Sequence, residues 1–163
     1  MNNEDLLLNT KSGIFSYRIA GVLIQDNKIL IQRTLNDTVY AFPGGHVAFG
    51  ETSQETLIRE FKEEMGADIF IERLLWIQEN FWKWGEDDCH QLCLYYSVKL
   101  NDDTQIHLDG SFTFQPQWEN EKYTLEFSWV ELSKLNDLKF YPEFAIEKVL
   151  NLSDHIEHFV IKQ

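Results

Sequence analysis

The chain has 163 residues, of which 44% are hydrophobic and 14% are aromatic. A chain of this length and content fills one core well but is too short for two comfortable domains, so we expect a single domain over residues 1–163. Asp and Glu number 27 against 14 Lys and Arg, which gives a net charge of −13. So acidic a chain repels DNA, RNA and anionic membranes, and we expect neither a polymeric nucleic acid nor a membrane as partner.

The two cysteines indicate a reducing compartment. Cys89 and Cys93 are four residues apart in an extended segment, which places their α-carbons roughly 13 Å apart at 3.3 Å per residue. A disulfide cannot span that distance. The sequence also shows no signal-peptide core, transmembrane run or lipidation motif, and we therefore expect a cytoplasmic protein.

Hydrophobic alternation and turn residues divide the chain into strands and two helices. They predict, in order, a hairpin over 15–24 and 28–33, a polar loop over 34–39, a helix from Thr52 to Gly66, strands over 69–84 and 89–100 around a loop at 85–88, short strands at 112–114 and 125–130, and a helix over 142–150. Residues 1–12 are expected to be loosely ordered, and 155–161 fit either a helix or an edge strand. Because both faces of the 89–100 strand carry apolar residues, a sheet covered on two sides is favoured.

The helix from Thr52 is the best-defined element. Thr52 and Glu55 form a capping box, and Gly66 provides the stop. Apolar side chains recur on one face, at Leu57, Ile58, Phe61 and Met65. The segment before the helix, with Pro43 and two adjacent glycines, predicts a backbone that turns sharply and approaches another group closely.

Three carboxylates lie in the last turns of the predicted helix, where negative charge is unfavourable. Glu60, Glu63 and Glu64 share one face in the last turns, where the helix dipole is negative. Like charges at this spacing cost about 0.2–0.5 kcal/mol per pair. A bound divalent cation would reverse that cost, and clustered oxygen ligands suit Mg²⁺ or Mn²⁺, with Ca²⁺ as an alternative. A solvated acidic face is the structural alternative for these three residues alone.

The wider spacing favours the metal interpretation. The fixed positions are Gly45, Glu51, Arg59, Glu60, Glu63, Glu64 and Gly66. With these residues the segment Gly45–Ala67 resembles the Nudix box, the signature of the Nudix hydrolase family. The resemblance implies an α+β fold, a Nudix-type α/β/α sandwich with a mixed β-sheet between helices. It also implies Mg²⁺-dependent hydrolysis of the pyrophosphate linkage in a nucleoside diphosphate joined to another group, with Mn²⁺ as an alternative cofactor.

Residue roles follow from the same resemblance. The metal ligands would be the carbonyl of Gly44 and the carboxylates of Glu60, Glu63 and Glu64. The catalytic set would comprise Glu63 and Glu60 with Arg59 and Glu51 as an orienting ion pair. The general base stays open, because family enzymes often recruit a further acid from a loop before a late strand. Candidates for that acid are Glu119, Glu121 and Glu126.

Residues outside the box are candidates for substrate contacts. Trp82 and Trp84 share a strand face and could stack a base, although core packing explains at least one of them equally well. Arg33, like Arg18, could reach phosphates. His90 could contact the ligand, but a lone strand histidine is more often structural.

The substrate class can be narrowed only partly. The proline that usually marks the ADP-ribose subgroup is missing near Trp82, and so is the tyrosine of dinucleoside-polyphosphate enzymes. Nucleoside triphosphates and nucleotide sugars therefore remain, as small phosphorylated partners. A non-catalytic nucleotide sensor with a Nudix fold is one alternative. A protein that merely binds Ca²⁺ is a second, although this chain lacks the Asp-rich loop of an EF-hand. Monomer and homodimer both stay open.

Overall fold

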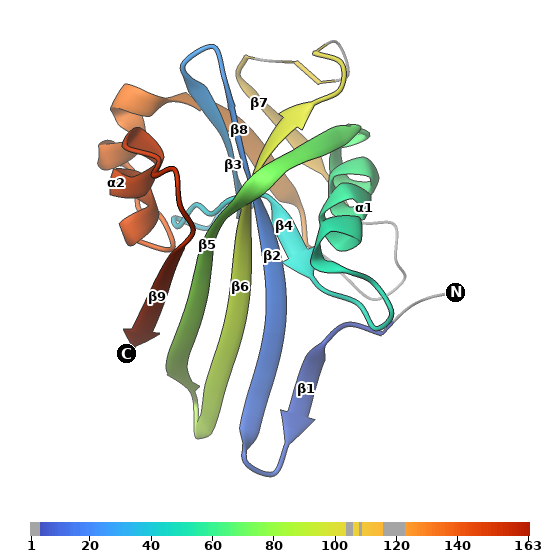
Figure 1. The fold of residues 1–163 in the computed structure, drawn as a ribbon, viewed down its shortest axis with the longest axis vertical. Helices are drawn as coiled ribbons and strands as arrows, with labels where there is room; N and C mark the ends of the chain where they lie inside the picture. The colour runs from blue at the N-terminus through green and yellow to red at the C-terminus, as the bar shows by residue number, and fades with distance from the viewer. Residues whose placement is uncertain (1–3, 104–105, 108, 116–122) are drawn as a thin grey trace.

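The computed structural model describes residues 4–103, 106–107, 109–115 and 123–163 (Figure 1). In chain order the elements are β1 (Leu7–Thr10), β2 (Gly13–Gln25), β3 (Lys28–Thr34), β4 (Gly44–His46), α1 (Ser53–Met65), β5 (Ile69–Trp84), β6 (Asp87–Leu100), β7 (Ser111–Phe114), β8 (Leu125–Glu131), a 3-10 helix (Leu132–Asp137), α2 (Phe144–Leu150) and β9 (Glu157–Lys162).

The strands form a mixed sheet with β2 near its centre. The strand order is β7-β8-β3-β2-β6-β5-β9, and β1 and β4 pair with β2 as well. The β2–β6 and β5–β9 pairs are parallel, whereas the other pairs are antiparallel. One edge of β2 is thus shared along its length by β1, β4 and the start of β3. β3 pairs with β2 only at its start, and residues of β2, β3 and β4 line the candidate site.

The sheet separates two hydrophobic cores, and the helices α1 and α2 lie on opposite sides of it (Figure 1). Leu57 and Phe61 of α1 are fully buried in the first core, and Ala145 and Val149 of α2 are buried in the second. Burying a Leu or Phe side chain contributes about 1.5–3 kcal/mol. The expected α/β/α sandwich with a mixed sheet is therefore confirmed.

The first predicted hairpin is also confirmed, and its turn has a clear local cause. Gln25 pairs with Lys28, so the loop contains only Asp26 and Asn27. Both loop residues have positive φ, 49° and 61°. Asp and Asn tolerate this conformation, and it matches the twist of the flanking strands.

Several boundaries differ from those expected from the sequence. Within the segment expected to be loosely ordered, Leu7–Thr10 forms strand β1 beside β2. The last helix begins at Phe144 rather than at Pro142. Of the two alternatives for residues 155–161, the structure has the edge strand, which forms β9 from Glu157. In β9, exposed and half-buried residues alternate, as in an edge strand with one covered face. Of the helices in the described ranges, neither α1 nor α2 is long and apolar enough to span a membrane.

Candidate active site

The two adjacent glycines bring strand β4 into close contact with both β2 and α1. A Cβ atom on Gly44 would lie 2.1 Å from the carbonyl oxygen of Ile19, in the backbone of β2. A Cβ atom on Gly45 would lie 2.6–2.8 Å from the carboxyl group of Glu60. Both positions therefore require glycine for separate reasons, one for sheet pairing and one to admit the Glu60 side chain beside the backbone.

Helix α1 is fixed at both ends as the sequence predicts. The hydroxyl of Thr52 accepts a hydrogen bond from the backbone N–H of Glu55 at 3.2 Å, and the Glu55 carboxylate accepts one from the N–H of Thr52 at 2.8 Å. Gly66 ends the helix in the left-handed conformation, with φ of 68°. The capping box and the glycine stop are thus confirmed, and they set where the carboxylates of the last turns project.

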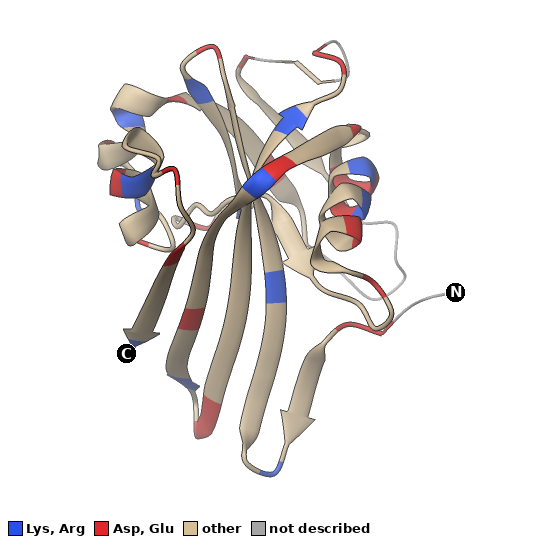
Figure 2. Ribbon diagram, viewed as in Figure 1, with Lys and Arg blue, Asp and Glu red and all other residues tan. Residues whose placement is uncertain are grey.

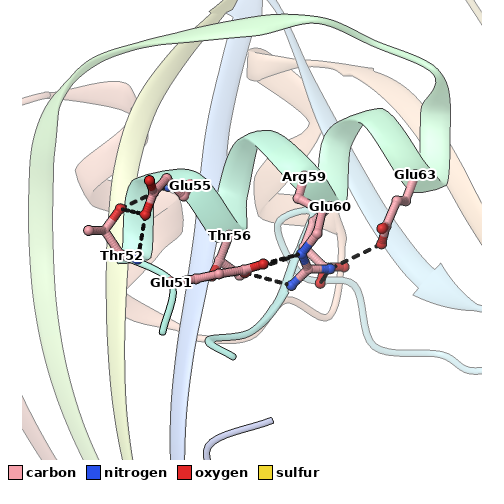
Figure 3. A network of polar contacts seen from close by, with 7 residues as sticks. All are labelled: Glu51, Thr52, Glu55, Thr56, Arg59, Glu60 and Glu63. Carbon is pink, nitrogen blue, oxygen red and sulfur yellow. Dashed lines mark hydrogen bonds and ion pairs between the residues drawn. The ribbon is translucent and has the colours of Figure 1, made fainter. Parts of the chain in front are cut away.

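Arg59 connects three carboxylate groups of the expected site into one network (Figure 3). Its Nε donates to Glu51 at 3.1 and 3.2 Å, and its Nη1 donates to Glu60 at 2.9 Å and to Glu63 at 3.0 Å. Glu51 also accepts a hydrogen bond from the buried hydroxyl of Thr56 at 2.8 Å. Burial alone would lower the pKa of Arg59, but the hydrogen bond and charge of Glu51 and the charge of Glu60 raise it overall.

Glu60 and Glu64 are carboxylates whose charge this protein does not fully compensate. Burial raises the pKa of Glu60, and the neighbouring Arg59 counteracts only part of that shift. Burial, and after it the charge of Glu60, raises the pKa of Glu64 to about 8. The Oε2 atom of Glu64 is buried and has no hydrogen-bond partner among the described residues. Such groups are costly unless a ligand or ion completes them.

The chemistry of these groups fits a divalent cation. Glu60, Glu64 and the backbone carbonyl of Gly44 offer the hard oxygen donors that Mg²⁺ and Mn²⁺ prefer, and all three residues line one cavity. Within the described part of the chain, no three His, Cys, Asp or Glu side chains are yet arranged to hold an ion. Glu63 instead pairs with Arg59.

The cavity extends well beyond the carboxylates. Its volume is about 870 Å³, and it lies between α1, β4, β3 and the region of β7 and β8. Arg18 of β2 lines it and, among the described residues, lacks the carboxylate partners that hold Arg33 and Arg59. His46 also lines it, and burial together with the charge of Arg18 lowers the pKa of His46 to about 4. The site thus combines an arginine and a neutral histidine with the carboxylates.

Arg33 lies at the same cavity, but its charge is engaged. The guanidinium donates to Glu126, directly opposite on β8, and to the carbonyl of Asp37 at 3.1 Å. It also lies 4.7 Å from the centre of the Tyr40 ring. Glu126 is therefore bound in an ion pair and does not line the cavity. The other two candidates for an additional acid, Glu119 and Glu121, lie outside the described residues.

The tryptophans and the histidine expected to contact substrate lie elsewhere. Trp84 is 71% exposed at the end of the β5–β6 hairpin, and neither it nor Trp82 lines the cavity of the carboxylates. His90 stacks on Phe81 with ring centres 4.2 Å apart and contacts the edge of Phe15. Trp82 and His90 border a smaller cavity of about 430 Å³. The sequence places these residues beside the 85–88 loop, but it does not show that they lie outside the cavity of the carboxylates.

Among the residues of the main cavity that sequence reasoning missed are Gln32, Tyr40 and His46. His46 directly follows the two glycines, and this adjacency was a usable signal. Gln32 is the one polar residue within the buried run Ile29–Gln32. A polar residue among fully buried neighbours deserved a functional explanation. Tyr40 carried no comparable signal, because its position depends on how the 34–43 segment folds back.

The charge distribution agrees with a site restricted to one region. Acidic and basic residues are interspersed along α1, whereas long stretches of β2, β5 and β6 carry few charges (Figure 2). The mixed sheet between two helices, the glycine pair and the acidic helix end together define the class of domain. The family model described as the NUDIX domain matches residues 16–149, and the chain belongs to this family.

Two curated relatives match parts of the chain. An ADP-ribose pyrophosphatase from Methanocaldococcus jannaschii is 39% identical over 65 residues, 38% of this chain and 38% of the relative. An RNA pyrophosphohydrolase from a Nitratiruptor species is 33% identical over 91 residues, 52% of this chain and 57% of the relative. The matches therefore span less than two thirds of either relative's length.

Solved structures share the fold at low sequence identity. A NUDIX hydrolase from Nitrosomonas europaea has a TM-score of 0.62 and 16% identity, with coverage of 95% of this chain and 82% of that chain. A UDP-X diphosphatase has a TM-score of 0.58 and 16% identity, with coverage of 88% and 66%. These likenesses establish the Nudix fold and, being so distant in sequence, only the fold.

Proposed function

We propose that this protein is a divalent-metal-dependent pyrophosphohydrolase. Its substrate is a nucleoside diphosphate linked to another group, such as a nucleoside triphosphate or a nucleotide sugar. The observation that carries the proposal is the pair of partly buried carboxylates, Glu60 and Glu64, beside the glycine pair in a cavity that also contains Arg18. A cavity of this size accommodates a nucleotide. Membership of the family supports the reaction class.

Each group has a proposed part in the reaction. Glu60, Glu64 and the carbonyl of Gly44 would hold Mg²⁺, with Mn²⁺ as a substitute, and Glu63 would join them once it leaves Arg59. A bound divalent cation neutralises phosphate charge and lowers the pKa of water. Arg18 would bind a phosphate oxygen and oppose the charge that develops during transfer. Arg59 and Glu51 would orient the carboxylates rather than contact the reacting atoms.

The proton acceptor is the remaining role to assign. Glu63 is more accessible than Glu60 and Glu64, with 38% of its side chain exposed. Its side chain lies at the cavity, where a carboxylate can accept a proton from water. We therefore propose Glu63 as the base. Glu126 is disfavoured because its carboxylate pairs with Arg33.

A substrate panel tests the proposed function. Purified protein would be incubated with Mg²⁺ and nucleoside triphosphates, nucleotide sugars, ADP-ribose or 5′-triphosphorylated RNA, and products would be separated by anion exchange. The chain should hydrolyse at least one small nucleotide, and Glu64→Gln should abolish that turnover. Glu147→Gln, on the exposed side of α2, is the matched control and should retain wild-type rates. Tight nucleotide binding without any turnover would favour the sensor alternative.

A further inference from the structure

The side chain of Gln32 is a buried polar group that the phosphate chemistry does not use. Gln32 is only 9% exposed, lies in β3 directly after the fully buried Ile31, and lines the main cavity. Its backbone is fully engaged, because its N–H donates to the carbonyl of Ala41 at 2.8 Å and its carbonyl accepts from the Ala41 N–H at 2.8 Å. The Oε1 atom of its carboxamide is buried and has no hydrogen-bond partner among the described residues.

An unsatisfied buried acceptor in a cavity wall indicates a ligand with a hydrogen-bond donor. Native proteins rarely leave such atoms without a partner, because the lost hydration is not replaced. Gln32 lines the cavity, so a bound molecule can reach its carboxamide. The carboxamide has one acceptor oxygen and a donor NH₂ group, so it can bind two adjacent polar atoms of opposite type.

The surroundings of Gln32 place it between two chemically different ends of the cavity. Its backbone partner Ala41 lies three residues before Gly44, next to the carboxylates. The opposite end is lined by Tyr40, Phe114 and Leu125, of which Phe114 and Leu125 face each other across β7 and β8. Aromatic and aliphatic walls suit a flat heterocycle, and the anionic end suits metal-bound phosphates.

We propose that Gln32 is a specificity-determining residue that contacts the hydrogen-bonding edge of the substrate's nucleobase. The Oε1 atom accepts a hydrogen bond from the base, and Nε2 donates one to it, while the apolar wall contacts the faces of the ring. This inference rests on the proposed function and refines it, since it identifies the nucleoside as the part of the substrate that is recognised. In protein–DNA complexes, glutamine side chains bind adenine through two hydrogen bonds in this way.

The test is a change in base preference measured by binding. Calorimetric titrations with ATP, GTP and inorganic tripolyphosphate, all with Mg²⁺, would use Gln32→Glu and Gln32→Leu in the Glu64→Gln background to prevent turnover. A carboxylate accepts two hydrogen bonds from the guanine edge but donates none to adenine. Gln32→Glu should therefore raise the GTP-to-ATP affinity ratio at least about tenfold, and Gln32→Leu should weaken both nucleotides about tenfold. Tripolyphosphate, which has no base, should bind Gln32→Leu as tightly as the parent protein, since neither side chain at position 32 is charged.

Controls separate base recognition from a structural role. Gln91→Glu on β6, outside the main cavity, should leave both nucleotide affinities unchanged. Gln32→Leu should not lower the melting temperature, because no hydrogen bond within the described protein is lost. An unchanged GTP-to-ATP affinity ratio in Gln32→Glu would overturn this inference. So would a loss of tripolyphosphate affinity in Gln32→Leu equal to its loss of nucleotide affinity. Neither result would affect the hydrolysis that the substrate panel measures. Absence of nucleotide binding by the unmodified protein would overturn both.

Discussion

At the scale of single residues, Gly44 and Gly45 are adjacent but differ in what a side chain would displace. A methyl group on Gly44 would collide with the main chain of Ile19, which cannot move without disturbing β2. A methyl group on Gly45 would collide with the end of the flexible Glu60 side chain. Stability should therefore depend mainly on Gly44, and function on Gly45.

Alanine substitutions separate these two effects. Gly44→Ala should lower the free energy of unfolding by about 1–3 kcal/mol, because the backbone must shift. Gly45→Ala should change it by about 0.5 kcal/mol or less but reduce turnover about 100-fold, because Glu60 is moved from its position. Urea denaturation and steady-state kinetics measure the two quantities. Equal losses of stability in both variants would contradict the assignment.

Glu64 makes the stability of the metal-free protein dependent on pH. Its pKa is raised to about 8 in the folded protein, by burial and then by Glu60, from an ordinary value of 4.5. Between these values the folded chain retains a proton that the unfolded chain has released. The free energy of unfolding therefore decreases as pH rises through this window, and Glu64 adds no further slope above about pH 8.

The corresponding variant removes that slope. In EDTA, the loss attributable to Glu64 between pH 5 and 8 should be about 2 kcal/mol, since one pKa unit corresponds to about 1.4 kcal/mol and solvent in the cavity reduces the effect. Glu64→Gln should be more stable than the unmodified protein at pH 8 and similar to it at pH 4.5. Urea denaturation across this range measures the difference, and parallel pH curves for the two proteins would refute it.

At the scale of elements, the capping box of α1 is predicted to contribute to stability independently of chemistry. Thr52→Ala removes the hydroxyl that accepts from the Glu55 N–H and should cost about 1 kcal/mol. For a chain of this size the melting temperature should fall by about 2–4 °C. Because Thr52 does not line the cavity, the KM should stay near its original value. A large rise in KM with an unchanged melting temperature would argue against this interpretation.

The sequence predicted the elements best where a local signal determined them. The Asp26-Asn27 turn, the capping box and the Gly66 stop are short-range features, and all three are confirmed. The edge strand β9 and the N-terminal β1 depend on pairing with distant strands, so their local pattern was ambiguous. The contacts of Glu51 with Arg59 followed from the family spacing, and the structure contains them.

Site residues outside the Nudix box were harder to predict from the sequence, because the pairing of distant strands determines which side chains line the same cavity. Trp82 and Trp84 have the composition of a base-stacking surface, but the length of the β5–β6 hairpin carries them away from α1. Gln32 and Tyr40 line the same cavity as the carboxylates because residues around Ala41 fold back along β3. No local pattern encodes that contact, which is why this part of the cavity wall emerged only from the structure.

At the scale of the whole molecule, the strong negative charge and an anionic substrate are compatible only through local positive charge. The net charge of −13 disfavours approach of a polyanion, yet the cavity contains Arg18 and carboxylates suited to a cation. In the proposed function, Mg²⁺ would serve both affinity and chemistry. The main cavity has the carboxylates of α1 on one side and the apolar side chains of Phe114 and Leu125 in its wall.

The most direct test of this account is the Mg²⁺ dependence of turnover for the best substrate, compared between the unmodified protein and Glu64→Gln. The turnover rate should rise with Mg²⁺ concentration, reach a plateau, and disappear in EDTA. Glu64→Gln should lose at least about 100-fold, since mutation of even indirect partners of metal ligands costs about 10- to 100-fold. A variant that is folded and hydrolyses the substrate at the original rate would contradict the assignment of the metal site to α1.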